Sequence, residues 1–115
     1  MGNFCVNPAN LHNGIILFNR GQFFDAHEAL EHVWRAAPGP EKKFLQGLIQ
    51  VAVALHHHSK GNGVGALSLL ERAARNLAPY EETFGGIDVG ELLCELSEWQ
   101  RCLKAGVPVP PPPRL

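Results

Sequence analysis

The chain has 115 residues, 45% of them hydrophobic and 18% charged, and its formal net charge is −1. This length and composition predict a single soluble domain with its own core, and they exclude a disordered chain. The charge argues against electrostatic binding to nucleic acid, and no apolar run approaches the roughly 20 residues that span a membrane.

The N-terminus and the cysteines indicate the compartment. No basic region followed by an apolar segment opens the chain, so no signal peptide is expected. The three cysteines, Cys5, Cys94 and Cys102, are an odd number without a paired spacing. Reduced thiols are typical of the cytosol, and we therefore expect a cytoplasmic protein with free cysteines.

Five helices are predicted, each bounded by residues that begin or end helices. They are expected over residues 8–18, 22–37, 41–59, 63–78 and 89–105. Asn7, Asn62 and Asp88 are the predicted N-caps, while Gly21 and Gly106 follow helix C-termini, where glycine adopts a left-handed conformation at little cost. No stretch alternates in the manner of a β-strand, so the predicted class is all-α, a bundle of about five helices.

The domain is expected to comprise residues 1–106, followed by a proline-rich tail over residues 107–115. Such a tail favours an extended polyproline-like conformation. We expect it to be flexible or to pack on its own domain, rather than to serve as a ligand for an SH3-like groove.

The third predicted helix, residues 41–59, is the most apolar segment of the chain. Apolar residues cover nearly its whole circumference, which predicts a central position in the bundle. It ends in His56, His57 and His58, near the negative end of the helix dipole. Because consecutive helical residues point in different directions, we interpret this run as a surface helix end and not as a chelating tract.

A weak internal repeat links the first four helices. Gly21, Ala26, Leu30 and Glu31 recur 40 residues later as Gly61, Ala66, Leu70 and Glu71. The first copy also resembles a tetratricopeptide unit, but arrays of that kind need three or more copies, so we predict a closed bundle of related hairpins. His27 takes the place that Leu67 has in the second copy, which predicts a core-facing position for the histidine.

The second predicted helix carries polar side chains in its apolar sector. At about 100° per residue, His27 and Glu31 lie on the same side as Trp34, and they are one turn apart. Glu28 and His32 form a second pair one turn apart, but they lie on the solvent side. His27 and Glu31 are therefore the inward pair.

A matching face is predicted on the third helix, where Gln46, Gln50, Val53 and His57 line up. A buried polar group without a partner costs about 1–3 kcal/mol. The cheapest arrangement brings the polar side chains of both helices together, and we expect the two faces to meet between the second and third helices.

Three interpretations of this cluster stay open. The first is a hydrogen-bonded network that only stabilises the core. The second is a metal site, although the Glu-x-x-His pair of di-iron bundles is missing and His-Glu-x-x-His is broken because residue 31 is Glu. The third is a pocket for a small molecule, or an enzyme in which His27 is a general base oriented by Glu31.

The residues resemble a family of small all-helical proteins, the domain-of-unknown-function family 309. The resemblance rests on residues 18–31 with Trp34, residues 44–54, His57, and Gly61-Asn62 with Gly65-Ala66, and it covers roughly residues 10–80. It implies an all-α bundle with the His-Glu stretch and the Gln-Gly-Leu-Ile-Gln stretch as signatures. It implies no particular activity.

Together these observations predict a bundle that binds a small molecule or a metal ion between its second and third helices. The expected ligand-binding residues are His27, Glu31, Trp34, Gln46, Gln50 and His57. No catalytic residue and no particular cofactor is assigned, and the apolar content of so small a chain suggests a homodimer. The alternative is a tetratricopeptide-like protein–protein interaction module with a purely structural polar network.

Overall fold

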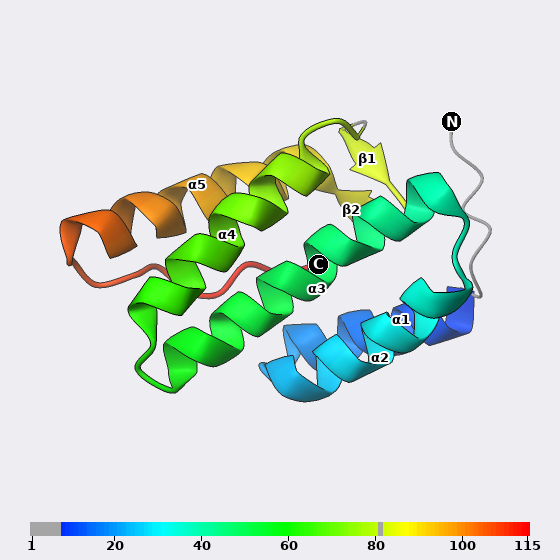
Figure 1. Ribbon diagram of the computed structural model, residues 1–115, viewed down its shortest axis with the longest axis horizontal. Helices are drawn as coiled ribbons and strands as arrows, with labels where there is room; N and C mark the ends of the chain where they lie inside the picture. Colours follow the sequence, from blue (N-terminus) through cyan, green and yellow to red (C-terminus); the bar gives the residue numbers. More distant parts are fainter. Residues whose placement is uncertain (1–7, 81) are drawn as a thin grey trace.

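The computed structural model describes residues 8–80 and 82–115 as five helices joined by short connections (Figure 1). The helices are α1 (Pro8–Asn19), α2 (Phe23–Ala36), α3 (Gly39–Ser59), α4 (Gly63–Leu77) and α5 (Val89–Ala105). Each helix packs mainly on the next one in the sequence, so that α3 lies between α2 and α4. The predicted number and order of helices are confirmed, and no helix in the described residues is long and apolar enough to cross a membrane.

A small β-hairpin, absent from the prediction, connects α4 to α5. Its strands are β1 (Thr83–Phe84) and β2 (Ile87–Asp88), which pair antiparallel. Gly85 and Gly86, at φ 59° and 79°, form the turn between them. Two-residue strands are too short to show an alternating pattern, so the sequence revealed only the glycine break.

The 40-residue repeat corresponds to two matching turns, one between α1 and α2 and one between α3 and α4. Gly21 and Gly61 have almost the same left-handed φ, 79° and 80°. The next N–H donates to the carbonyl five residues back in both turns: Gln22 to Leu17 over 3.0 Å, and Asn62 to His57 over 2.9 Å. This pattern ends both helices in the same way and starts two similar hairpins.

Two of the predicted N-caps are confirmed. Asn62 Oδ1 accepts from the N–H of Gly65 over 2.9 Å, and Asp88 Oδ1 accepts from the N–H of Glu91 over 2.9 Å. The third, Asn7, lies outside the described residues. Helix α3 begins at Gly39, two residues earlier than predicted, because a proline in the first turn lacks only an N–H that would have no helical partner.

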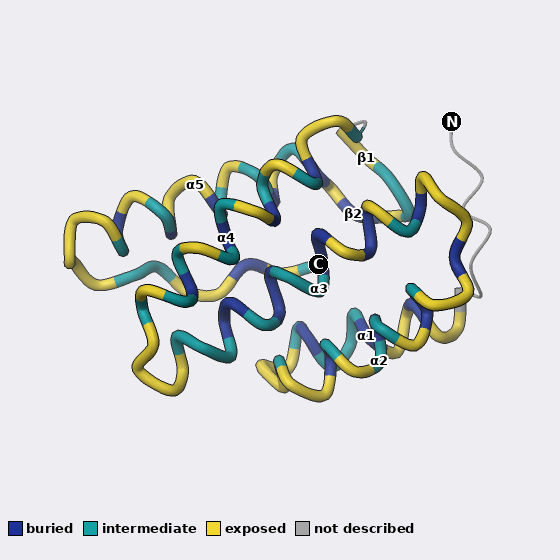
Figure 2. The backbone as a smooth tube through the Cα atoms, in the orientation of Figure 1, coloured by how far each residue is buried: buried dark blue, intermediate teal, exposed yellow. Residues whose placement is uncertain are grey.

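Helix α3 supplies much of the core and sits close to its neighbours (Figure 2). Its fully buried residues are Phe44, Leu45, Leu48, Val51, Ala52 and Ala54. Gly47 lets α4 approach, since a Cβ atom built there would lie 2.8 Å from the Leu77 side chain. The predicted central position of this helix is confirmed.

The proline-rich tail packs on the helices. From Gly106 it runs back along the molecule toward α1 (Figure 1). Pro113 is buried, and Val109 and Leu115 pack on the hydrophobic core. Of the two expectations for this segment, the structure shows the self-packing one.

Candidate functional site

Two pockets lie between α2 and α3, and together we call them the α2–α3 groove. The histidine pocket, about 200 Å³, is lined by Phe24, His27, Val53, His56 and His57. The tryptophan pocket, about 210 Å³, is lined by Glu31, Trp34, Gln46, Ile49 and Gln50. All six predicted ligand-binding residues line one pocket or the other, but they form two neighbouring groups and not one cluster.

The pair formed by His27 and Glu31 links the two pockets, because His27 lines one and Glu31 lines the other. Nε2 of His27 lies 3.4 Å from Oε2 of Glu31, and Oε1 of Glu31 accepts from Nη2 of Arg35 over 3.1 Å. Both contacts join residues one turn apart on α2. Glu31 is thus held between two side chains that fix the direction of its carboxylate.

The position of His27 corrects the expectation of a core-facing residue. The side chains of His27 and Glu31 are 24% and 39% exposed, so the pair lies at the rim of the groove and not in a sealed core. Leu67, the equivalent residue in the second hairpin, is also half-buried. The repeat therefore matched the two positions correctly, but both lie at a helix edge.

Two ring nitrogens of α2 are buried and have no hydrogen-bond partner among the described residues: Nδ1 of His27 and Nε1 of Trp34. The residues are seven positions apart, which is about 10 Å along a helix. Burying such a group without a partner costs about 1–3 kcal/mol. Native proteins rarely keep such groups without a reason, and each of these belongs to a side chain that lines a pocket.

The glutamines of α3 do not complete the cluster as predicted. Gln50 Oε1 accepts from Nδ2 of Asn76 over 2.8 Å, so its carboxamide is engaged with α4. Gln46 is exposed at the edge of the tryptophan pocket. The ammonium of Lys42 lies 4.6 Å from the centre of the Trp34 ring, which places a positive charge beside this pocket.

The histidine pocket is more aromatic than the sequence suggested. Phe24 is 51% exposed, and its ring centre lies 5.7 Å from that of His27 and 5.5 Å from that of His56. His58 points elsewhere and packs edge-on against Trp99, with the ring centres 5.0 Å apart. The histidine run thus diverges as predicted, but His56 and His57 both reach the pocket.

Sequence reasoning missed Phe24, Ile49 and His56 as lining residues. Phe24 stands seven residues before Glu31, two helical turns away on the same side of α2. His56 was set aside with the rest of the histidine run, although it lies three residues after Val53, on an adjacent part of the same face. Glu28 and His32 are exposed, as predicted.

No set of metal ligands is present in the part of the chain that the structure describes. Within residues 8–80 and 82–115, no group of three or more His, Cys, Asp or Glu side chains is arranged to hold a metal ion. His27, His56 and His57 line the same pocket without forming such a group.

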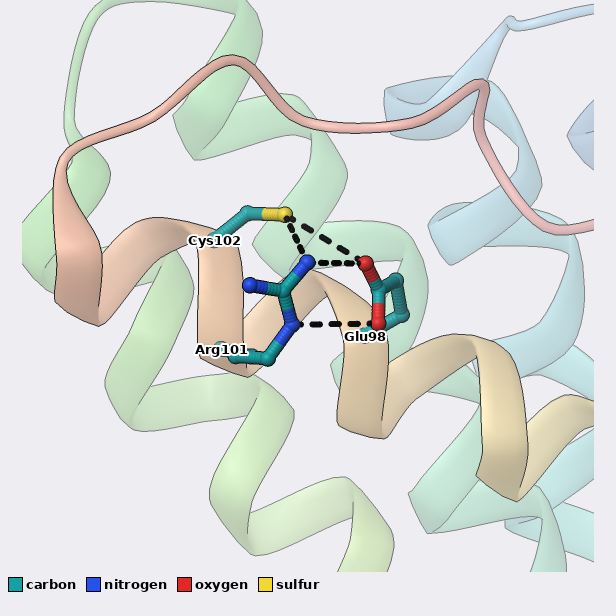
Figure 3. Close-up of polar contacts among 3 residues, drawn as sticks. All are labelled: Glu98, Arg101 and Cys102. Carbon is teal, nitrogen blue, oxygen red and sulfur yellow. Dashed lines mark hydrogen bonds and ion pairs between the residues drawn. The ribbon is translucent and has the colours of Figure 1, made fainter.

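A separate polar cluster lies on α5 (Figure 3). Arg101 Nε donates to Oε1 of Glu98 over 3.2 Å, and its Nη2 donates to the other carboxylate oxygen and to Sγ of Cys102, the latter over 3.7 Å. The hydrogen bond from Arg101 lowers the pKa of Glu98. The Arg101 and Glu98 side chains are exposed, and neither lines the α2–α3 groove. Cys94 and Cys102 are free thiols.

Fold and site define a small all-helical domain whose second and third helices enclose a polar-edged groove. The chain belongs to the family described as "Domain of unknown function (DUF309)", whose profile matches residues 11–69. This match confirms the resemblance noted in the sequence. It spans α1 to α3 and part of α4, and therefore the whole α2–α3 groove.

Two relatives are longer proteins. The chain is 38% identical over 82 residues to a protein of Aquifex aeolicus (strain VF5) described as uncharacterized, a match that covers 70% of this chain and 25% of the relative. It is also 38% identical over 74 residues to the uncharacterized protein YpuF of Bacillus subtilis (strain 168), covering 62% of this chain and 42% of YpuF. The chain thus spans less than half the length of these relatives.

Proposed function

We propose that the α2–α3 groove binds a small amphipathic molecule, with His27 and Trp34 as its hydrogen-bonding partners. The observation that carries this proposal is the pair of buried ring nitrogens that have no partner among the described residues, each on a side chain that lines one of the pockets. A ligand that reaches both would satisfy both. The two pockets together fall within the roughly 300–1,000 Å³ typical of small-molecule sites.

The groups around the groove indicate the ligand's chemistry. The carboxylate of Glu31 favours the tautomer of His27 with its proton on Nε2, which leaves a lone pair on Nδ1 for a donor of the ligand. Trp34 has only an N–H to offer and needs an acceptor. Because Lys42 lies over the Trp34 ring, a negatively charged acceptor such as a carboxylate is favoured at that end.

Apolar contacts would hold the middle of the ligand. Val53 and Ile49 lie on successive turns of α3, and the exposed Phe24 also lines the histidine pocket. The favoured ligand therefore has an amine, amide or hydroxyl donor about 10 Å from a carboxylate, with an apolar body between them.

A screen of amphipathic carboxylates against untagged protein tests this proposal. Binding would be followed by thermal stabilisation and by the indole N–H resonance of Trp34 in nitrogen-15 spectra. We expect a bound compound to lose at least tenfold in affinity with His27→Ala and with Trp34→Phe, but not with His32→Ala, an exposed control on the same helix. Equal affinity for all four proteins would contradict the proposal.

A second candidate is a tetratricopeptide-like interaction module. The observation in its favour is the pair of matching hairpins, with the same left-handed glycine and the same hydrogen bond at each turn. Stacked helical hairpins present extended surfaces on which peptide segments bind. This candidate predicts that surface variants of one face abolish binding of a partner while helical content and unfolding midpoint stay unchanged.

A further inference from the structure

A second groove, distinct from the α2–α3 groove, is occupied by the chain itself. It lies between α1, with its turn into α2, and α5, and residues 107–115 run through it; we call it the tail groove. We propose that the tail groove recognises an extended, proline-rich segment of a partner protein, and that residues 107–115 occupy it in cis. This inference rests on the interaction-module candidate and is independent of the small-molecule site.

The groove holds the tail by its backbone. Nε1 of Trp99 donates to the carbonyl of Pro111 over 3.2 Å, and Oδ1 of Asn19 accepts from the N–H of Leu115 over 2.8 Å. A polyproline-like segment makes no internal hydrogen bonds, so its backbone groups are free for such contacts. Because these contacts do not involve the tail's side chains, they would hold any extended segment that places a carbonyl and an N–H at the same two points.

Side-chain burial adds a preference for proline at one position. Pro113 is buried, and Pro110, three residues earlier, is half-buried. The chain bends at Pro111, so the two rings stand on either side of a bend in the segment. Pro111 and Pro112 are exposed. The groove thus covers the segment most fully at the position of Pro113, and this is the position at which we expect it to select proline.

Trp99 is well placed to read a backbone carbonyl. Its ring is buried, and His58 at the end of α3 packs edge-on against it. A tryptophan with a fixed ring and a single N–H is the residue type that lines grooves for proline-rich peptides.

The tail fills the groove incompletely. A cavity of about 380 Å³ stays open between residues 111–114 of the tail and the end of α1 with its turn. Most of the residues that line it are exposed, so the cavity is a hollow at the surface and not an interior void. A partner segment that replaced the tail and also filled this space would make contacts that the chain's own tail does not make.

Charge indicates what that segment carries. Arg20 and Arg114 both line the cavity, and its described lining contains no carboxylate. The charged side chains that line the cavity are therefore all cationic. A partner segment with an acidic residue in place of Arg114 would pair with Arg20 instead, through a charge-assisted hydrogen bond.

Peptide binding to the full chain tests the inference. The probe is a fluorescein-labelled peptide with the sequence of residues 107–115, together with its R114E version, followed by fluorescence anisotropy. The protein is the wild type and Pro113→Asp, which weakens the cis contact by placing a charge at a buried position. We expect Pro113→Asp to bind the peptide at least tenfold more tightly than the wild type, and the R114E peptide to bind at least threefold more tightly than the original.

Matched variants locate the binding site. In the Pro113→Asp background, Asn19→Ala should weaken binding about fivefold, whereas Asn13→Ala, exposed on α1, should leave it unchanged. Arg20→Ala should remove the preference for the R114E peptide. Circular dichroism confirms that the variants keep their helices; should Pro113→Asp unfold, Leu115→Ala replaces it as the variant that weakens the tail.

The outcomes separate the claims. Absence of peptide binding by a folded tail variant would overturn the inference. Binding of non-proline extended peptides at the same groove, removed by Asn19→Ala, would keep the interaction module but overturn the preference for proline. A dimer seen by light scattering that the peptide dissociates would show that a second copy of the chain is the occupant, and would overturn the external partner.

Discussion

Oε2 of Glu31 lies 3.4 Å from Nε2 of His27, and Oε1 of Glu31 accepts a hydrogen bond from Arg35 over 3.1 Å. The carboxylate therefore orients the histidine ring at the rim of the α2–α3 groove. Both partners lie one helical turn away on α2. Such partly exposed pairs each stabilise a helix by only about 0.3–0.5 kcal/mol. These two contacts therefore add little to the stability of the fold, and we infer that their role is to orient His27.

A Glu31→Ala variant tests this inference. We expect it to lower the free energy of unfolding by less than about 1 kcal/mol, because two exposed pairs are lost. The same variant should weaken a groove ligand as strongly as His27→Ala does. Urea denaturation and ligand titration measure the two effects, and a loss of several kcal/mol would assign Glu31 to the fold and not to the site.

The two tryptophans offer a matched comparison. Trp34 Nε1 is buried without a partner among the described residues, whereas Trp99 Nε1 donates to Pro111. Trp34→Phe removes a buried donor whose lack of a partner lowers stability. We therefore expect the free energy of unfolding of the ligand-free protein to be unchanged or higher by about 1 kcal/mol. Trp99→Phe removes a satisfied donor and leaves a carbonyl without it, which should cost about 1 kcal/mol.

Urea unfolding of both variants checks this prediction, with ligand binding as the second measurement. A more stable Trp34→Phe protein that has lost ligand affinity would show that the indole N–H is retained for binding. Equal destabilisation by both substitutions would show that Trp34 contributes to the core as Trp99 does, and would weaken the proposed site.

Gly47 is predicted to be essential for the contact between α3 and α4. A Cβ atom there would meet the Leu77 side chain at 2.8 Å, in a fully buried position. Alanine favours a helix over glycine by about 1 kcal/mol, but overpacking a core costs about 1–3 kcal/mol. We expect Gly47→Ala to lower the free energy of unfolding by about 1–2 kcal/mol.

Gly63 is the control for this substitution. It is also helical, but a Cβ atom there would meet only Leu103, at an ordinary 4.0 Å. Gly63→Ala should therefore be neutral or slightly stabilising. Thermal unfolding of both variants distinguishes the effect of packing from that of helix propensity, and a stabilised Gly47→Ala protein would contradict the close approach.

The parts of the fold that the sequence predicted are those with local causes. Gly21 and Gly106 both adopt the left-handed conformation that their place after a helix indicated. The N-caps Asn62 and Asp88 each accept a hydrogen bond from the N–H three residues ahead, so each interaction depends on only four consecutive residues. Helical periodicity also brought His27, Glu31 and Trp34 to the side of α2 that faces α3.

What the sequence did not predict depends on distant contacts. Gln50 engages Asn76, 26 residues away, and Leu115 engages Asn19, 96 residues away. No local pattern indicates either pair. The partial exposure of His27 was not predicted for the same reason. It depends on the distance between α2 and α3 beside His27, and not on the order of residues along α2.

The partly buried position of Tyr80 leads us to expect a loss of stability at high pH. Burial raises its pKa above the ordinary value, since the charged phenolate is disfavoured where the ring packs against Phe44 and Phe84. Its hydroxyl also donates to the carbonyl of Pro40 at the start of α3. A group whose pKa is raised by folding contributes stability that is fully present below its unfolded pKa and is lost as the pH rises through the folded pKa.

The chain contains a single tyrosine, so phenolate absorbance reports this one group. We expect its titration midpoint to lie above that of a tyrosine in an unfolded chain, and to fall to the ordinary value in urea. The free energy of unfolding should decline in the same alkaline range. Tyr80→Phe, which keeps the aromatic packing but loses the donor to Pro40, should remove this part of the decline. If the variant and the wild type lose stability in parallel through that range, then other side chains that titrate there, and not Tyr80, cause the alkaline loss of stability.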